Sequence, residues 1–339
     1  MTLIDLSTIP SSASSPDWDV PKVTVGRGKH LVTRTSTSTT TVIGRALKEL
    51  GLEFKTFLAS SPSLQELHKF IRPWILPGSN QVQPMVLEWM SYFGSPVIAA
   101  KLERFDLVAA LLDCGFQFGP GIVTHAVEIA VKTNSPATLE FVLDRGWDIN
   151  QSIRFDSVPI LGQVVDNRAL VEWCLSRGAD PNGTCARGYT IMQRAASKAT
   201  LATVKRLIAV GGDISPTSQS AGVVAHAVEG HSEDKNRIPI IEYLLSVGAD
   251  INAVYLIQEK HDQFCLDYLA MDKTALHVAI HRGDRTLIEY LLVRGADATA
   301  KTRNRFTNMR WMDVVEFAEH REHTDLVGLL REVKESVET

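Results

Sequence analysis

The stretch from Thr274 to Asp297 reads TALHVAIHRGDRTLIEYLLVRGAD, and it decides the fold. Its apolar pairs, Leu287-Ile288 and Leu291-Leu292, are spaced to form one stripe along a helix. Gly295 follows the stripe, and a glycine in the left-handed conformation commonly ends a helix. Upstream, the small residue Ala279 marks a second short helix that can approach the first closely. The stretch therefore predicts a pair of packed helices.

The same phrase recurs five times upstream. Each copy has an apolar pair, two spacers, a second apolar pair, two more residues and a glycine, although the copy ending at Gly146 is looser. The closing glycines are Gly115, Gly146, Gly178, Gly211, Gly248 and Gly295. They are separated by 31, 32, 33, 37 and 47 residues, so the underlying period is close to 33. A recurring period of this length indicates a repeat architecture.

The last of these copies carries the most complete motif. Thr274-Ala275-Leu276-His277-Val278-Ala279 is followed by Gly283-Asp284 and then by Leu291–Asp297. The copy resembles the ankyrin repeat, whose pattern is T-P-L-H-x-A-A, then G-H, then L-L-x-x-G-A-D, with alanine here in place of the proline. The segments Gly178–Asn182 and Gly248–Ala253 resemble ankyrin turns. The resemblance implies an all-α ankyrin-repeat solenoid, built of helix-turn-helix repeats with finger loops between them.

Composition divides the chain into three parts. Residues 1–42 are rich in serine and threonine and lack apolar periodicity, so we expect a flexible tail. Residues 43–93 show helical periodicity separated by prolines and are expected to form a helical N-terminal cap. Residues 94–339 hold about seven ankyrin-like repeats, of which the first three have lost T-P-L-H. The last repeat ends in charged residues, as a terminal cap requires.

Overall composition is that of an ordinary soluble protein. The 339 residues are 45% apolar and 22% charged, with a net charge of -4, which argues against a general nucleic-acid binder. No apolar stretch of about 18 residues is present to cross a membrane, and the chain starts without a secretory signal. These features predict an intracellular protein of the cytoplasm or nucleus. By their spacing, the cysteines are expected to be unpaired thiols: Cys114, Cys174, Cys185 and Cys265.

The sequence lacks the motifs of catalysis and cofactor binding. It has neither a G-x-x-x-x-G-K-[ST] phosphate loop nor a G-x-S-x-G nucleophile elbow. His277 and His281 have the spacing of a metal pair, but no third ligand is apparent. The ankyrin resemblance implies instead that His277 is a structural histidine, hydrogen-bonded to the turn backbone. We therefore predict no enzymatic activity, no cofactor, no metal site and no small-molecule substrate.

Insertions break the period: His231–Ile238 lengthens the turn between the two helices of the fifth repeat, and the finger after that repeat is also longer. That finger and the one after the sixth repeat are candidate binding surfaces. The finger at 249–273 is rich in aromatic residues and either binds a partner or folds back as a short helix, Asp262–Leu269, over the repeats. The finger at 296–312 mixes arginine with aromatics and either meets an acidic partner or phosphate groups, or is merely solvated. In the finger before Thr190, two residues occupy tip positions that ankyrin proteins often use and expose. The predicted partner-binding residues are Arg187, Tyr189, Tyr255, Phe264, Tyr268, Arg303, Arg305, Phe306 and Trp311.

The resemblance implies a non-enzymatic protein–protein interaction scaffold, whose partner is another protein rather than nucleic acid or membrane. A more specific hypothesis is a regulatory adaptor similar to ankyrin-type transcriptional coregulators, which bind a DNA-binding factor rather than DNA. For such a role the basic residues of Lys22–Arg34 would act as a nuclear signal, although we favour the interpretation that they are simply solvated. The alternative is a substrate-recruiting adaptor of a ubiquitin ligase, which would need a ligase-docking box in residues 43–93. No clear F-box is visible there.

Overall fold

The structure is a computed structural model, and it describes residues 38–92, 95–215, 222–230, 237–254, 273–302 and 311–338. These residues form helices, and they contain isolated β-bridges but no strand of a sheet. The chain divides into two compact units, Met1–Leu50 and Gly51–Thr339. Helix α1 (Ser38–Ala59) begins inside the segment expected to be a tail, so helical structure starts before the apolar periodicity does. The division into tail, cap and repeats remains a prediction.

Three short elements precede the repeats in the second unit: α2 (Leu64–Ile71), the 3-10 helix η2 (Arg72–Trp74) and α3 (Pro84–Tyr92). Ser63 caps α2, since its hydroxyl accepts from the Glu66 N–H and the Glu66 carboxylate accepts from the Ser63 N–H. The Phe54 ring stacks on Phe70 at 5.3 Å between centroids and lies 5.8 Å from Phe116. Aromatic packing thus joins this region to the first repeat.

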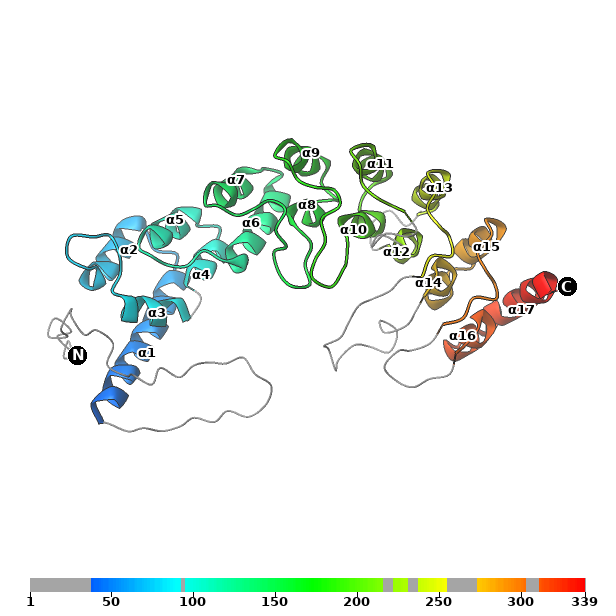
Figure 1. Cartoon of the computed structure of the whole chain (residues 1–339). Helices are drawn as coiled ribbons and strands as arrows, with labels where there is room; N and C mark the ends of the chain where they lie inside the picture. Colours follow the sequence, from blue (N-terminus) through cyan, green and yellow to red (C-terminus); the bar gives the residue numbers. More distant parts are fainter. Residues whose placement is uncertain are drawn as a thin grey trace. The chain divides into compact units, whose positions relative to one another are not determined.

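Seven helix pairs follow within the described residues. They are α4 (Ser95–Lys101) with α5 (Phe105–Asp113), α6 (Pro120–Thr133) with α7 (Ala137–Asp144), α8 (Ile160–Gln163) with α9 (Arg168–Ser176), α10 (Ile191–Lys198) with α11 (Leu201–Ala209), α12 (Val223–Glu229) with α13 (Ile238–Ser246), α14 (Ala275–Arg282) with α15 (Arg285–Val293), and α16 (Val314–His320) with α17 (Thr324–Glu338). First helices of successive pairs pack on one another, as α10 does on α12, α12 on α14, and α14 on α16 (Figure 1). The predicted all-α repeat architecture is confirmed.

The repeated apolar stripe forms the buried face of each second helix. In α15, Leu287, Ile288 and Leu291 are buried, and the other copies bury the equivalent positions except Thr138 of the looser copy, which is half-buried. The last stripe residue, such as Leu292, is only half-buried in every copy. A helix turns about 100° per residue, so this position lies at the edge of the stripe. The six closing glycines all have φ between +84° and +99°, confirming that each adopts the left-handed conformation.

Single asparagine side chains connect neighbouring repeats after these glycines. The Asn182 side-chain amide donates to the Gly211 carbonyl at 2.9 Å, and its Oδ1 accepts from the Asp213 N–H at 2.7 Å. Asn150 makes the same pair of bonds with the following repeat, and so does Asn252. The Asn252 bonds reach Gly295 and Asp297, beyond the 249–273 finger. The register between repeats is therefore retained across the finger.

A ladder of ion pairs runs between the second helices of successive repeats. In each pair an arginine of the later repeat meets a carboxylate of an earlier one: Arg145–Asp113, Arg177–Glu140, Arg206–Glu172 and Arg294–Glu242. Arg145, Arg177 and Arg294 also lie over an aromatic ring four residues earlier in their own repeats. These exposed pairs contribute little energy individually, but within the described residues they link neighbouring repeats at four junctions.

Candidate protein-binding surface

The finger between α9 and α10 is a tight hairpin with Arg187 at its tip. An isolated bridge joins Thr184 to Thr190, and the Cys185 N–H donates to the Tyr189 carbonyl at 3.0 Å. Gly188 provides the left-handed turn residue, with φ +77°. At the base of the finger, Thr190 caps α10 in a reciprocal pair of hydrogen bonds with Gln193. The hairpin is thereby anchored on the helix that follows it.

Arg187 meets an aromatic residue of the preceding finger. Its guanidinium lies 5.6 Å from the centroid of the Phe155 ring, within the range of a cation–π interaction. Phe155 is 62% exposed, which is unusual for so large an apolar side chain, and it lies in the short loop closed by the Arg154–Ser157 bridge. Two adjacent fingers therefore present a joined surface of one aromatic ring and one half-buried cation.

Tyr189 differs from the sequence-based expectation of an exposed tip residue. It is half-buried, and its ring packs edge-on against His226 of α12, with 5.2 Å between the ring centroids. Burial raises the pKa of the Tyr189 phenol to about 12. His226 of the next repeat covers the Tyr189 side chain, so Tyr189 packs at the base of the finger. Arg187 is likewise half-buried.

The other predicted binding residues lie in the two long fingers. Trp311 is 47% exposed and precedes Met312, whose backbone forms the Thr302–Met312 bridge with N···O distances of 2.8 Å in both directions. Trp311 is therefore held at the foot of its finger with its ring accessible. The remaining candidates lie outside the described residues: Tyr255, Phe264, Tyr268, Arg303, Arg305 and Phe306. The short helix predicted at Asp262–Leu269 and Cys265 lie outside them as well.

His277 takes the structural role that the resemblance implies. The side chain is fully buried, and Nδ1 lies 3.3 Å from the Thr274 backbone nitrogen, which donates to it. Its ring meets Phe317 of the next repeat edge-on at 5.5 Å. Burial lowers the pKa of His277 to about 4, and Lys273 acts in the same direction. The imidazole is therefore neutral at physiological pH and joins α14 to α16.

Several titratable side chains surround this position without forming a metal site. Burial, aided by the nearby Arg321 charge, lowers the pKa of Lys273 to about 8 and that of His281 to about 4. Glu229 acts in the opposite direction on both groups. Among the described residues, no three histidine, cysteine or carboxylate side chains are grouped to hold a metal ion.

Comparison with known proteins identifies the repeat. The ankyrin repeat family model matches residues 271–303, the copy with the most complete motif. This is an ankyrin-repeat protein. Among solved structures, the human ASB11 ankyrin repeat domain is similar over 61% of this chain and 82% of that chain, with 19% sequence identity and a TM-score of 0.42. No curated protein matches the sequence.

Ankyrin repeats mediate binding to other proteins, so this chain carries a protein–protein interaction domain. Ankyrin-repeat proteins are typically non-enzymatic scaffolds. Within the described part of this ankyrin-repeat protein, each helix is too short or too polar to span a lipid bilayer. Cys114, Cys174 and Cys185 are buried free thiols, as predicted.

Phe155 is the exposed residue of this ankyrin-repeat surface that sequence reasoning missed. It stands alone between Arg154 and Asp156, without the periodic pattern that marks core residues. The sequence feature that could have predicted an exposed contact here is a single large apolar residue within a polar finger. Its contact with Arg187 spans 32 residues of sequence and one repeat, so only the stacking of the repeats reveals it.

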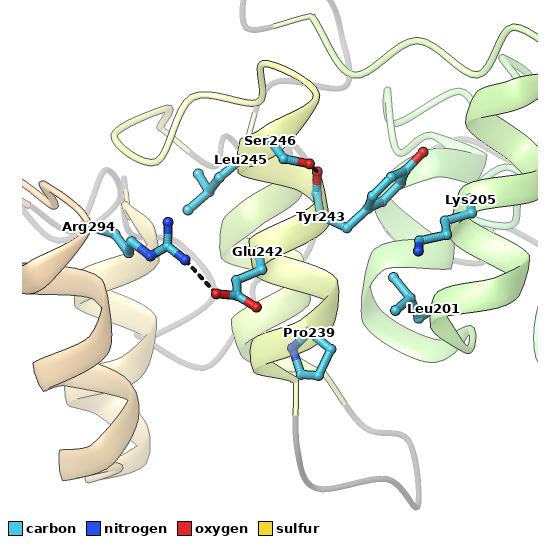
Figure 2. Close-up of a pocket in the computed structure, with 8 residues that line it drawn as sticks. All are labelled: Leu201, Lys205, Pro239, Glu242, Tyr243, Leu245, Ser246 and Arg294. Carbon is cyan, nitrogen blue, oxygen red and sulfur yellow. Dashed lines mark hydrogen bonds and ion pairs between the residues drawn. The ribbon is translucent and has the colours of Figure 1, made fainter.

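A shallow groove between second helices of the ankyrin repeats is shown in Figure 2. It has a volume of about 540 Å³ and lies between α11 and α13. Its charged groups already have partners: Arg294 pairs with Glu242 at 2.5 Å, and the Lys205 ammonium lies 5.1 Å from the centroid of the Tyr243 ring. This internal pairing leaves little unsatisfied charge for a ligand.

Proposed function

We propose that this ankyrin-repeat protein is a non-enzymatic regulatory adaptor that binds a partner protein through its fingers. The observation that carries the proposal is the cation–π pair of Arg187 and the exposed Phe155. Arginine and aromatic residues are enriched at the centres of protein interfaces, where a few such side chains supply most of the binding energy. Trp311 adds a second exposed aromatic residue on a later finger.

The more specific role that we favour is that of a transcriptional coregulator acting on a DNA-binding factor inside the cell. A net charge of -4 suits contact with a protein better than contact with DNA, whose backbone is recognised mainly by cationic side chains. Arg303, Arg305 and Phe306 extend the same arginine–aromatic composition along the finger of Trp311. Tyr255, Phe264 and Tyr268 are kept as candidates for a separate contact on the 249–273 finger.

Affinity purification followed by mass spectrometry tests this proposal. The intact protein is compared with a variant that combines Phe155→Ala, Arg187→Glu and Trp311→Ala. We expect the variant to lose specific partners, because removing an interface hot spot costs at least about 2 kcal/mol, or roughly thirtyfold in affinity. A second variant, Arg303→Glu with Arg305→Glu, tests the arginines of the Trp311 finger by the same readout.

A matched control replaces exposed residues away from the fingers. Val293, which is 85% exposed on α15, is changed to Ala, and exposed Lys101 is changed to Glu. This control should retrieve the same partners as the intact protein. Equal retrieval by the intact protein and both finger variants would show that the fingers changed in these variants are not the binding surface. Retrieval of double-stranded DNA by the purified protein alone would contradict the coregulator role.

A further inference from the structure

A second groove lies between α2 and α5, away from the fingers. It has a volume of about 830 Å³ and is larger and more apolar than the groove between α11 and α13. Leu64, Ile75, Ala109 and Ala110 line it, and Leu64 is 39% exposed although it begins α2. The groove is thus an apolar trough between two helices, open to solvent.

The acidic residues that line this groove already have partners. Asp106 receives two hydrogen bonds from the Arg104 guanidinium, at 2.8 and 2.6 Å. The Arg104 hydrogen bonds lower the pKa of Asp106, which keeps that carboxylate ionised and paired. Asp113 lies 3.7 Å from Arg145 of the next repeat. The acidic wall on α5 therefore presents little net charge.

The opposite wall is basic. Lys69 and Arg72 both line the groove and are exposed. Along α2, Lys69 acts electrostatically on Glu66, whose carboxylate also accepts from the Ser63 N–H and hydroxyl. The exposed imidazole of His68 lines the same wall. An apolar trough with one cationic edge remains.

We propose that this groove binds an amphipathic helix of a partner protein whose apolar face is flanked by carboxylates. Leucine-sized side chains would cover Leu64, Ile75, Ala109 and Ala110, and the carboxylates would pair with Lys69 and Arg72. Such a helix-in-groove mode places apolar anchors at i, i+3, i+4 and i+7. The segment Lys22–Arg34 of this chain does not fit, because it is basic. A nucleic acid would match the cations but leave the apolar trough uncovered.

The test uses a defined peptide and the full-length protein. The probe is a fluorescein-labelled amphipathic helix of about 18 residues, with leucine on one face and glutamate on both flanks. Fluorescence anisotropy at low salt should show binding to the intact protein. Lys69→Glu with Arg72→Glu should weaken binding by at least about tenfold, because charge reversal places like charges against the probe. Filling the trough by Ala109→Gln should also weaken binding.

Matched controls separate this groove from general charge effects. Lys101→Glu with Lys301→Glu makes the same change in net charge at exposed sites elsewhere and should bind the probe normally. A probe with lysine in place of glutamate, and one with serine in place of leucine, should not bind. Circular dichroism and thermal melting of each variant verify the fold. The inference fails if the intact protein does not bind the probe, if both charge-reversal variants bind equally, or if a single-stranded oligonucleotide displaces the probe.

The proposed binding through the fingers and the proposed binding in the groove between α2 and α5 can be tested separately. The Phe155→Ala, Arg187→Glu and Trp311→Ala variant should still bind the acidic probe with unchanged affinity, since none of these residues lines the groove. Loss of probe binding in that variant would contradict the placement of the probe between α2 and α5.

Discussion

At the scale of single residues, Asn182 shows how one side chain joins two repeats. Its side-chain amide donates a hydrogen bond to the Gly211 carbonyl, and its Oδ1 accepts one from the Asp213 N–H. We expect Asn182→Ala to lower the free energy of unfolding by about 1 kcal/mol, because both bonds are lost at a solvent-exposed site. Urea denaturation measures the change, and Asn80→Ala at an exposed position serves as the control. An Asn182→Ala variant as stable as the control would contradict this role.

His277 makes stability depend on pH. Its folded-state pKa is about 4 against an ordinary 6.5, because burial disfavours the charged form. The unfolded chain therefore takes up the proton first, and the stabilisation present above pH about 6.5 is lost as the pH falls toward 4. His277→Gln should be less stable than the intact protein at pH 7, with the gap narrowing by about 2 kcal/mol by pH 5. Denaturant titrations at both pH values measure it, and a constant gap would contradict the assignment.

At the scale of secondary-structure elements, Arg237 holds the ends of two helices. It is buried just before α13, and its guanidinium donates to the carbonyls of Ala196 and Ala199 at the end of α10 and of Ala227 in α12. Arg237→Met should destabilise the protein by about 2 kcal/mol, since buried carbonyls lose their donor. Arg237→Lys should restore little, because a single ammonium cannot reach three acceptors as a planar guanidinium does.

Exposed Arg168, at the start of α9, provides the comparison for Arg237. Arg168→Met should change the free energy of unfolding by less than about 0.5 kcal/mol. Equal effects of the two methionine substitutions in guanidinium denaturation would show that the carbonyl contacts of Arg237 contribute no stability.

The local sequence predicts the helices themselves, but it does not predict the side-chain contacts between repeats. Stripe residues and closing glycines predict each second helix, since both signals lie within a few residues of each other. Arg237 lies in a stretch that reads as a lengthened turn, and its acceptors are up to 41 residues away. Tyr189 is covered by His226, which belongs to the next repeat. The burial of side chains at the bases of the fingers depends on how the repeats stack, and a single copy of the motif does not contain that information.

At the scale of the whole molecule, we expect the repeats to stack without the long finger between the fifth and sixth repeats. Helix α12 packs directly on α14, and Asn252 bonds to Gly295 and Asp297 across the finger. Replacing residues 256–271 by a short glycine-serine link should therefore change the free energy of unfolding by no more than about 1 kcal/mol, the scale of loop-closure differences. Denaturation followed by circular dichroism measures this. A second unfolding transition, or loss of helical signal, would contradict it.

The same deletion also separates folding from recognition. If Tyr255, Phe264 or Tyr268 binds a partner, the shortened protein should melt normally yet lose that partner in affinity purification. Retention of every partner would restrict recognition to the other fingers and to the groove between α2 and α5.

The ladder of ion pairs along the second helices has a direction. In each rung the arginine belongs to the later repeat and the carboxylate to an earlier one. A ribosome releases the amino-terminal end first, so at these four junctions the carboxylate is synthesised before the arginine that pairs with it. Each of the four arginines therefore emerges after the hairpin that carries its counterion.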